Sequence, residues 1–197
     1  MSSRARATRP RRTSATASTR SRCAWPRTRR RRAAVVSGGS GQVRQVAVCG
    51  PSVCTPEEAA AARSVGELLA AAGAVVLCGG YGGVMEAAAE GAARAGGLVI
   101  GVLSGADRTG ANRELSAAIV TGMGQARNHV LVASADAVIA VGGSWGTLSE
   151  VAMAVRSGST PVIGLGGWRV LDAGGTELPG PRQASSPEEA VGWALES

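Results

Sequence analysis

The chain has 197 residues, of which 45% are hydrophobic, a length that supports one substantial core and one folded domain. Its formal net charge of +7 is unevenly distributed. Residues 1–40 hold twelve of the 21 basic residues and none of the 14 acidic ones, which leaves nine arginines against 14 acidic residues over 41–197. The high pI therefore describes the tail, and it does not indicate that the domain itself binds nucleic acid.

The tail, residues 1–40, is rich in Arg, Ser, Thr, Ala and Pro. A segment of this composition buries too little apolar surface to offset its ordering entropy, so we expect it to be disordered. Three interpretations are open: an arm that binds nucleic acid or another acidic surface, a targeting peptide, or extra sequence translated from an upstream start site. All 21 cationic residues are arginine, which indicates a GC-rich bacterial genome in which such extensions arise easily.

Membrane and metal sites are not expected. No run of about 18 apolar residues predicts a membrane span, and no apolar segment of a secretory signal follows the arginines, so we expect a cytoplasmic protein. Cysteines 23, 49, 54 and 78 form no C-x-x-C pair, and His129 is the one histidine, so we expect no bound metal and no resident cofactor. Cys49 and Cys78 end apolar runs and are expected to be buried thiols.

Short apolar runs alternate with alanine-rich helical segments from residue 43 onward, which predicts βα units. The runs are continuous rather than alternating, as in parallel strands that are covered on both faces. The expected fold is α/β, a Rossmann-like three-layer sandwich with a mostly parallel sheet, formed by residues 41–197. The predicted strands are 46–49, 75–78, 98–103, 118–120, 137–141 and 161–165.

Capping signals place the helices between these strands. Thr55 supplies an N-cap, with proline next and Glu58 completing a capping box, and Gly73 ends this first helix. A last helix is expected after Ser186. Residues 166–185, rich in Gly and Pro, are expected to form a loop or an excursion before this helix. The other predicted helices are 83–95, 123–134 and 147–156.

Three glycine-containing loops, 50–52, 79–83 and 142–147, each follow a predicted strand. In an open parallel sheet, ligands bind outside the carboxyl ends of the strands, and glycine loops before helices suit phosphate groups. There is no G-x-G-x-x-G after the first strand, and a P-loop is impossible in a chain without lysine. The predicted ligand-binding residues are Gly50, Ser52, Gly79, Gly80, Tyr81, Gly82, Gly142, Gly143, Ser144, Trp145, Gly146 and Thr147.

Several of these side chains also have structural interpretations. Glu150 lies in the expected first turn of a helix and is either a carboxylate beside the ligand or the partner of Thr147 in a capping box. The rings of Tyr81 and Trp145 either stack on a base or pterin or pack over their loops. His129 is expected at the surface, and serine or threonine hydroxyls in the loops are also common turn and cap groups.

Three segments, Gly79-Gly-Tyr-Gly-Gly-Val-Met85, Gln125-Ala-Arg-Asn128 and Val141-Gly-Gly-Ser-Trp-Gly-Thr-Leu-Ser-Glu150, resemble the ordered motifs of the LONELY GUY (LOG) group of the SLOG superfamily. The resemblance implies a Rossmann-like homodimer that hydrolyses the N-glycosidic bond of a nucleoside 5′-monophosphate. By position, it implies that Arg127 and Glu150 are the catalytic residues and that the loop 142–147 contacts phosphate. In such a reaction, the carboxylate would stabilise an oxocarbenium-like state and orient water.

The chain departs from the LOG motifs at two places. Val141 stands where the group has proline, and Ala126-Arg127-Asn128 stands where it has an acidic residue, arginine and lysine. These changes are more similar to a neighbouring branch that includes molybdenum-cofactor carriers. Three hypotheses follow: a phosphoribohydrolase, a non-catalytic carrier or sensor of a phosphorylated heterocycle, and nucleic-acid association through the tail alone. The expected partner is a phosphorylated small molecule, with no membrane.

Overall fold

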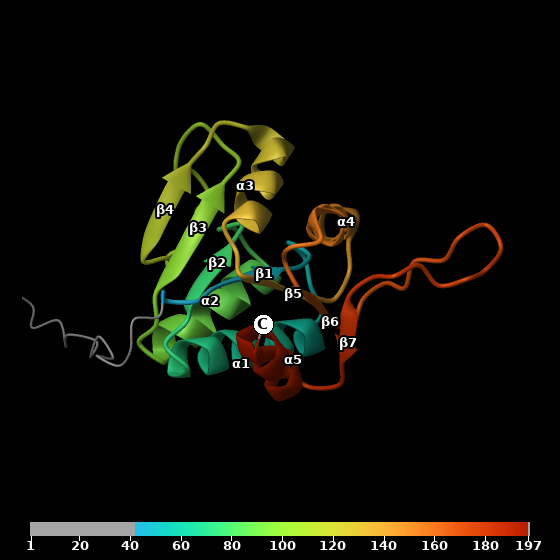
Figure 1. The fold of residues 1–197 in the computed structure, drawn as a ribbon. Helices are drawn as coiled ribbons and strands as arrows, with labels where there is room; N and C mark the ends of the chain where they lie inside the picture. Colours follow the sequence, from blue (N-terminus) through green and yellow to red (C-terminus); the bar gives the residue numbers. More distant parts are fainter. Residues whose placement is uncertain (1–41, 197) are drawn as a thin grey trace, which may run out of the picture. The chain divides into compact units, whose positions relative to one another are not determined.

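The computed structural model describes residues 42–196, and these form a seven-stranded sheet with helices on both faces (Figure 1). The strand order is β4-β3-β2-β1-β5-β6-β7, and every neighbouring pair is parallel. The expected α/β Rossmann-like fold is thereby confirmed, while the tail predicted over 1–40 lies outside the described residues. The strands are β1 (Gln45–Cys49), β2 (Val75–Cys78), β3 (Val99–Leu103), β4 (Ala117–Val120), β5 (Ala137–Val141), β6 (Val162–Leu165) and β7 (Arg182–Ala184).

Two hydrophobic clusters fill the space between the sheet and its helices. On one face, α1 (Pro56–Ala71), α2 (Val84–Arg94) and α5 (Pro187–Glu196) pack with residues such as Val46 and Val48 of β1. On the other face, α3 (Arg127–Ala133) and α4 (Trp145–Ser157) pack with Ala47 and Cys49 of the same strand. Successive residues of a strand point to opposite faces, so covering both faces requires the continuous apolar runs seen in the sequence.

The sheet has a topological switch point between β1 and β5. From β1 the chain passes through α1 to β2 on one side, whereas from β5 it passes through α4 to β6 on the other side. The loops that follow β1 and β5 therefore diverge at their strands' carboxyl ends, which is where open α/β sheets bind ligands. The fold thus brings the loops after residues 49 and 141 to one place.

The structure differs from the predicted secondary structure in two places. Residues 166–185 were expected to be a loop or an excursion, but Arg182–Ala184 form the edge strand β7 beside β6. The preceding residues 166–181, here called the arm, extend away from the sheet (Figure 1) and contain one antiparallel bridge, Leu171 to Glu177. The helix expected over 123–134 is divided into a 3₁₀ turn, Gly124–Ala126, and α3.

Helices α1 and α2 cross with their backbones in contact. A Cβ atom added at Gly66 of α1 would overlap the carbonyl oxygen of Ala88, and one added at Gly91 of α2 would overlap that of Arg63. Side chains at helix–helix contacts normally hold the two axes 8–10 Å apart, and glycine permits a closer approach. This crossing therefore depends on the absence of both side chains.

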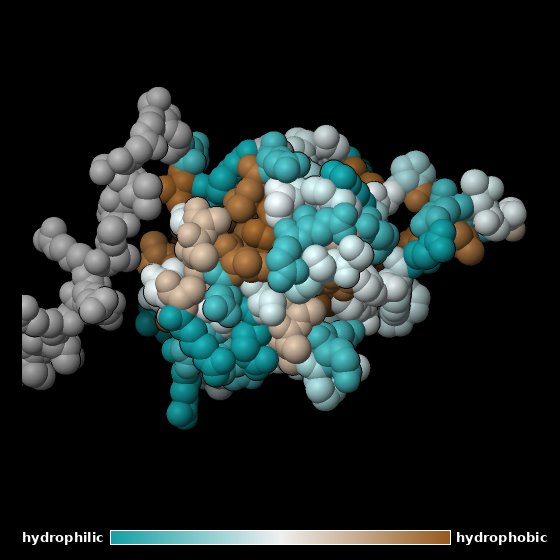
Figure 2. All heavy atoms as spheres, turned by 90° about the horizontal axis from the view of Figure 1, so that it is seen from below, coloured by the Kyte–Doolittle hydropathy of each residue, from teal (hydrophilic) through white to brown (hydrophobic). Residues whose placement is uncertain are grey.

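Hydrophilic residues cover much of the outer surface on the side of α1, α2 and α5, and the arm at the right shows hydrophobic residues among hydrophilic ones (Figure 2). The large exposed hydrophobic residues of the arm are Trp168, Val170, Leu171 and Leu178. Within the described part of the chain, none of the helices combines the length and the hydrophobicity that a membrane span needs.

Candidate functional site

The N-terminus of α4 carries a row of unpaired backbone donors. Ser144 is the N-cap: its Oγ accepts from the N–H of Thr147 at 3.2 Å, and its carbonyl accepts from Leu148. Among residues 42–196, no acceptor pairs with the N–H groups of residues 143, 144, 145 and 146. Four consecutive free donors at the positive end of a helix dipole favour a bound anion. We call residues 143–146 the anion nest.

The glycine loops pack on one another, so part of their glycine content serves the fold. A Cβ atom at Gly50 would overlap the side chain of Val84 at the start of α2. Gly142 has φ of +65°, and a Cβ atom there would overlap the carboxylate of Glu58 in α1. These contacts bring together the loops after β1, β2 and β5 without any ligand.

At two other loop glycines, Gly82 and Gly146, an added Cβ atom would make only ordinary van der Waals contacts. A Cβ atom at Gly82 would find its nearest neighbour at 3.6 Å, and one at Gly146 would find only Ser144 Oγ, at 3.7 Å. Neither has a positive φ. The fold does not require glycine at these two positions, so they are the places where a ligand can approach the backbone.

Gly146→Ala is expected to leave the free energy of unfolding unchanged or raised by less than about 1 kcal/mol, because alanine favours the helix and meets no neighbour. Gly142→Ala should lower it by at least about 1 kcal/mol, because a residue with a Cβ is strained at positive φ. Urea denaturation of both variants measures the difference. Equal destabilisation would show that Gly146 too is required by the fold.

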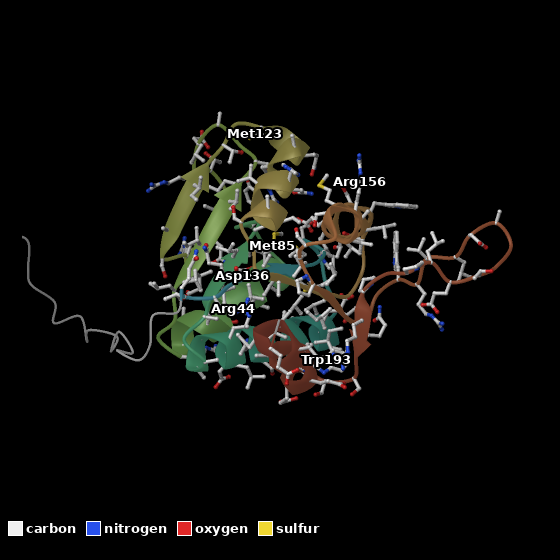
Figure 3. The ribbon with its side chains drawn as sticks, in the orientation of Figure 1. Arg44, Met85, Met123, Asp136, Arg156 and Trp193 are labelled. Carbon is white, nitrogen blue, oxygen red and sulfur yellow. The ribbon has the colours of Figure 1, made fainter. Side chains whose placement is uncertain are left out.

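Arg127 and Glu150 form a buried ion pair beneath these loops. Arg127 Nη1 lies 3.5 Å from Glu150 Oε1, and each residue is 7% exposed. The guanidinium packs against Gly79, where a Cβ atom would overlap Nη2 and would lie 2.5 Å from the sulfur of Met85 (labelled in Figure 3). The absence of a side chain at Gly79 thus leaves the space that the guanidinium and the Met85 sulfur occupy. The capping-box interpretation of Glu150 is wrong, because Ser144 caps a helix that begins two residues earlier than expected.

Burial has the largest effect on the pKa values of Glu150 and of the neighbouring thiols Cys49 and Cys78. It raises the pKa of the Glu150 carboxyl, while the charge of Arg127 and a hydrogen bond from the Cys49 thiol oppose the rise. The pKa of Cys49 lies well above its usual value, because the thiol is buried and faces the Glu150 charge. Burial also raises the pKa of Cys78 to about 11. Both cysteines are therefore neutral thiols, as expected from their apolar strands.

In the first turn of α3, two buried polar atoms have no partner within residues 42–196: Nε of Arg127 and Oδ1 of Asn128. Both residues belong to the first turn of α3 and are less than 10% exposed. Buried polar groups are rarely left unpaired, since each unmade hydrogen bond is unfavourable. A buried donor and a buried acceptor are thus free at the start of α3. Asn128 was not among the predicted site residues.

The aromatic side chains of the loops differ in position. The hydroxyl of Tyr81 accepts from the N–H groups of Ser104 and Gly105, at 3.1 and 3.2 Å, so it joins the loops after β2 and β3. Tyr81 therefore packs within the fold. Trp145 is 79% exposed and meets Trp168 of the arm edge to face, with 4.8 Å between ring centroids. Trp168 was not predicted; its only signal was a tryptophan in a glycine-rich segment.

The remaining predicted residues are placed as follows. The hydroxyls of Ser144 and Thr147 bond to each other at 2.9 Å, and Thr147 is buried. Ser52 is exposed at the rim of the loop after β1, and His129 is exposed on α3. Gly80 has a positive φ of 80° in the loop after β2. No group of three or more metal-binding side chains gathers within residues 42–196.

The parallel sheet, its switch point and the glycine loops above it define a Rossmann-like α/β protein. The model of the SLOG cluster4 family matches residues 43–191, and the chain belongs to this family. This confirms the resemblance to the SLOG superfamily.

This chain aligns with nearly the full length of three similar proteins. An uncharacterised protein of Archaeoglobus fulgidus is 38% identical over 161 residues, 79% of this chain and 97% of that protein. The molybdenum cofactor binding protein of the phototrophic bacterium Rippkaea orientalis is 36% identical, with a TM-score of 0.70 and 80% and 98% of the two chains covered. The molybdenum cofactor carrier protein of Chlamydomonas reinhardtii is 30% identical, with a TM-score of 0.65 and coverage of 79% and 98%.

Proposed function

We propose that this protein binds molybdenum cofactor, or a closely related phosphorylated heterocycle, at the switch point and holds it without cleaving it. The observation that carries the proposal is the position of Glu150. In glycoside hydrolysis a carboxylate must face the anomeric carbon and a water molecule. Here the carboxylate is buried beneath the loops and neutralised by Arg127. The similarity to a molybdenum cofactor binding protein and to a molybdenum cofactor carrier protein also supports binding without cleavage.

The anion nest provides the affinity for the phosphate group. Its four free N–H groups replace the hydration of a phosphate, and the α4 dipole adds a favourable charge interaction. Gly146 leaves room for the phosphate oxygens to approach the backbone. The ligand is held by preformed groups, and none of them needs to exchange a proton.

Hydrolysis of a nucleoside 5′-monophosphate is the alternative. The observation in its favour is that Arg127 and Glu150, 23 residues apart, meet at the switch point, as the LOG resemblance implies. For catalysis, Glu150 would have to separate from Arg127 and reach the ligand. Assembly as a homodimer and a cytoplasmic location, both expected from the sequence, remain predictions.

The test uses the purified full-length chain with molybdenum cofactor and, separately, with AMP, GMP, CMP and UMP. After gel filtration, we expect molybdenum and pterin to elute with the protein, and chromatography to detect no free base. Gly146→Asp should reduce the bound cofactor at least about tenfold, equivalent to about 1.4 kcal/mol, because a carboxylate in the nest repels phosphate. Asp is tolerated at a helix N-terminus, so the variant should fold.

Gly192→Asp is the matched control, since this helical glycine of α5 has no neighbour within 4 Å of an added Cβ. Its cofactor retention should equal that of the unaltered protein. Base release by the unaltered protein but not by Glu150→Ala would establish the hydrolase instead. If cofactor is not retained and no base is released, the proposed function is wrong.

A further inference from the structure

We propose that the heterocyclic part of the ligand lies in an apolar cavity along α4, rather than across the sheet edge toward Tyr81. The ligand class would be a phosphate ester of a flat, fused heteroaromatic ring that carries an acceptor group at its far end. This inference rests on the proposed function, because it assumes that a phosphate occupies the anion nest.

The cavity lies between α4, the ends of β5 and β6, and the arm, and has a volume of about 390 Å³. This volume falls within the range of about 300–1,000 Å³ that is usual for small-molecule sites. Its lining is mainly apolar, with α4 contributing Leu148, Val151 and Val155 and the arm contributing Trp168, Val170 and Leu178. Such a lining favours an apolar or aromatic occupant.

The cavity is continuous with the anion nest, because Gly143 and Ser144 belong to both. Trp168 packs directly over Gly143, where an added Cβ would lie 2.7 Å from its Cδ1 atom. Trp168 thus forms a wall where the nest and the cavity meet. A phosphate on the nest places the group attached to it next to an indole ring, and aromatic rings pack favourably against flat heterocycles.

The far end of the cavity is marked by Arg156, in the last turn of α4 (labelled in Figure 3). Arg169 also lines the cavity, but its guanidinium is paired with Glu177. In the described part of the chain, Arg156 forms no ion pair. From Ser144 to Arg156 the backbone of α4 rises by about 18 Å, so the two residues lie at opposite ends of the helix and of the cavity that both line. A carbonyl or anionic group on the far side of the ring would complement Arg156.

Ala152→Phe tests the cavity without altering the nest or the buried ion pair. Ala152 lines the cavity and is exposed, so phenylalanine can fill the space without overpacking the core. Ser149→Phe is the matched control, because Ser149 lies on the same helix but does not line the cavity. The probes, titrated calorimetrically into the full-length chain, are inorganic phosphate and the metal-free phosphopterin obtained by oxidising molybdenum cofactor.

Phosphopterin is expected to bind the unaltered protein at least about tenfold more tightly than phosphate, equivalent to about 1.4 kcal/mol. In Ala152→Phe, phosphopterin should bind no more tightly than phosphate, while the affinity for phosphate stays unchanged. In Ser149→Phe, the tighter binding of phosphopterin should remain. If phosphopterin binds no more tightly than phosphate, or if Ala152→Phe retains its affinity, the cavity does not hold the ring, although the phosphate site stands. If neither probe binds the unaltered protein, the proposed function itself fails.

Discussion

Replacing Arg127 with leucine is expected to lower the free energy of unfolding by about 3 kcal/mol at pH 7, the lower end of the range for breaking a buried ion pair. The substitution leaves the Glu150 carboxylate buried without its cation, and it removes the side chain that packs against Gly79. Urea denaturation of the variant and of the unaltered protein measures the effect.

The loss of stability should depend on pH in a defined direction. Burial raises the pKa of Glu150 in the folded protein above its unfolded value, so folding favours the protonated carboxyl. The favourable contribution of Glu150 to the free energy of unfolding is present below its unfolded pKa and is lost as the pH rises through its folded pKa. Arg127 opposes this rise, so its removal raises the folded pKa further. The destabilisation by Arg127→Leu should therefore be smaller at pH 5 than at pH 8.

The double variant Arg127→Leu/Glu150→Gln is the control for this effect. It lacks the titrating group, so its difference from the single variant Glu150→Gln should stay constant with pH, whereas the difference between Arg127→Leu and the unaltered protein should not. Comparing the variants at pH 5, 6, 7 and 8 cancels contributions from the exposed carboxyls, which all the proteins share. A difference between Arg127→Leu and the unaltered protein that stays constant with pH would contradict the role assigned to Glu150.

Gly66→Ala should lower the free energy of unfolding by about 2 kcal/mol, although alanine is the better helix former. The added methyl group would overlap the carbonyl of Ala88, and backbone cannot move aside as a flexible side chain can. Gly91→Ala is expected to act similarly through Arg63. Since both substitutions separate the same two helices, the double variant should lose less than the sum of the two. Thermal and urea denaturation provide the values.

Gly192→Ala supplies a control of opposite sign. Gly192 is also a helical glycine, but no atom lies within 4 Å of an added Cβ. Here only the helix propensity changes, and the free energy of unfolding should rise by up to about 1 kcal/mol. Destabilisation by Gly192→Ala as large as that by Gly66→Ala would mean that the contact between α1 and α2 is not the cause.

Much of the fold was predictable because burial on both faces leaves a continuous apolar run in the sequence. The strands 75–78 and 137–141 were predicted with their observed bounds. Strand β7 was missed because Arg182-Gln-Ala184 is a short edge strand with no apolar run. Its position depends on pairing with β6, and no local pattern records a pairing between distant segments.

For the site, the sequence located the loops but could not assign a role to each glycine. Gly142 is needed because its φ is +65°, and the carboxylate of Glu58, 84 residues earlier, packs against it, whereas Gly146 has no positive φ and would tolerate a Cβ atom. The spacing of Thr147 and Glu150 satisfied a capping box equally well. The choice depended on Ser144, which caps α4 earlier and leaves Glu150 to pair with Arg127.

The arm has a consequence for how ligand preference can change among relatives. Residues 166–180 are exposed, so they contribute one wall of the cavity while adding little to the buried core. Substitutions or insertions in this segment would reshape the wall, and the sheet and the backbone donors of α4 would remain as they are. On the proposed function, recognition of the phosphate and selection among its attached groups are thus separable in the chain. Members of the family with the same sheet would then differ in ligand through a single surface segment.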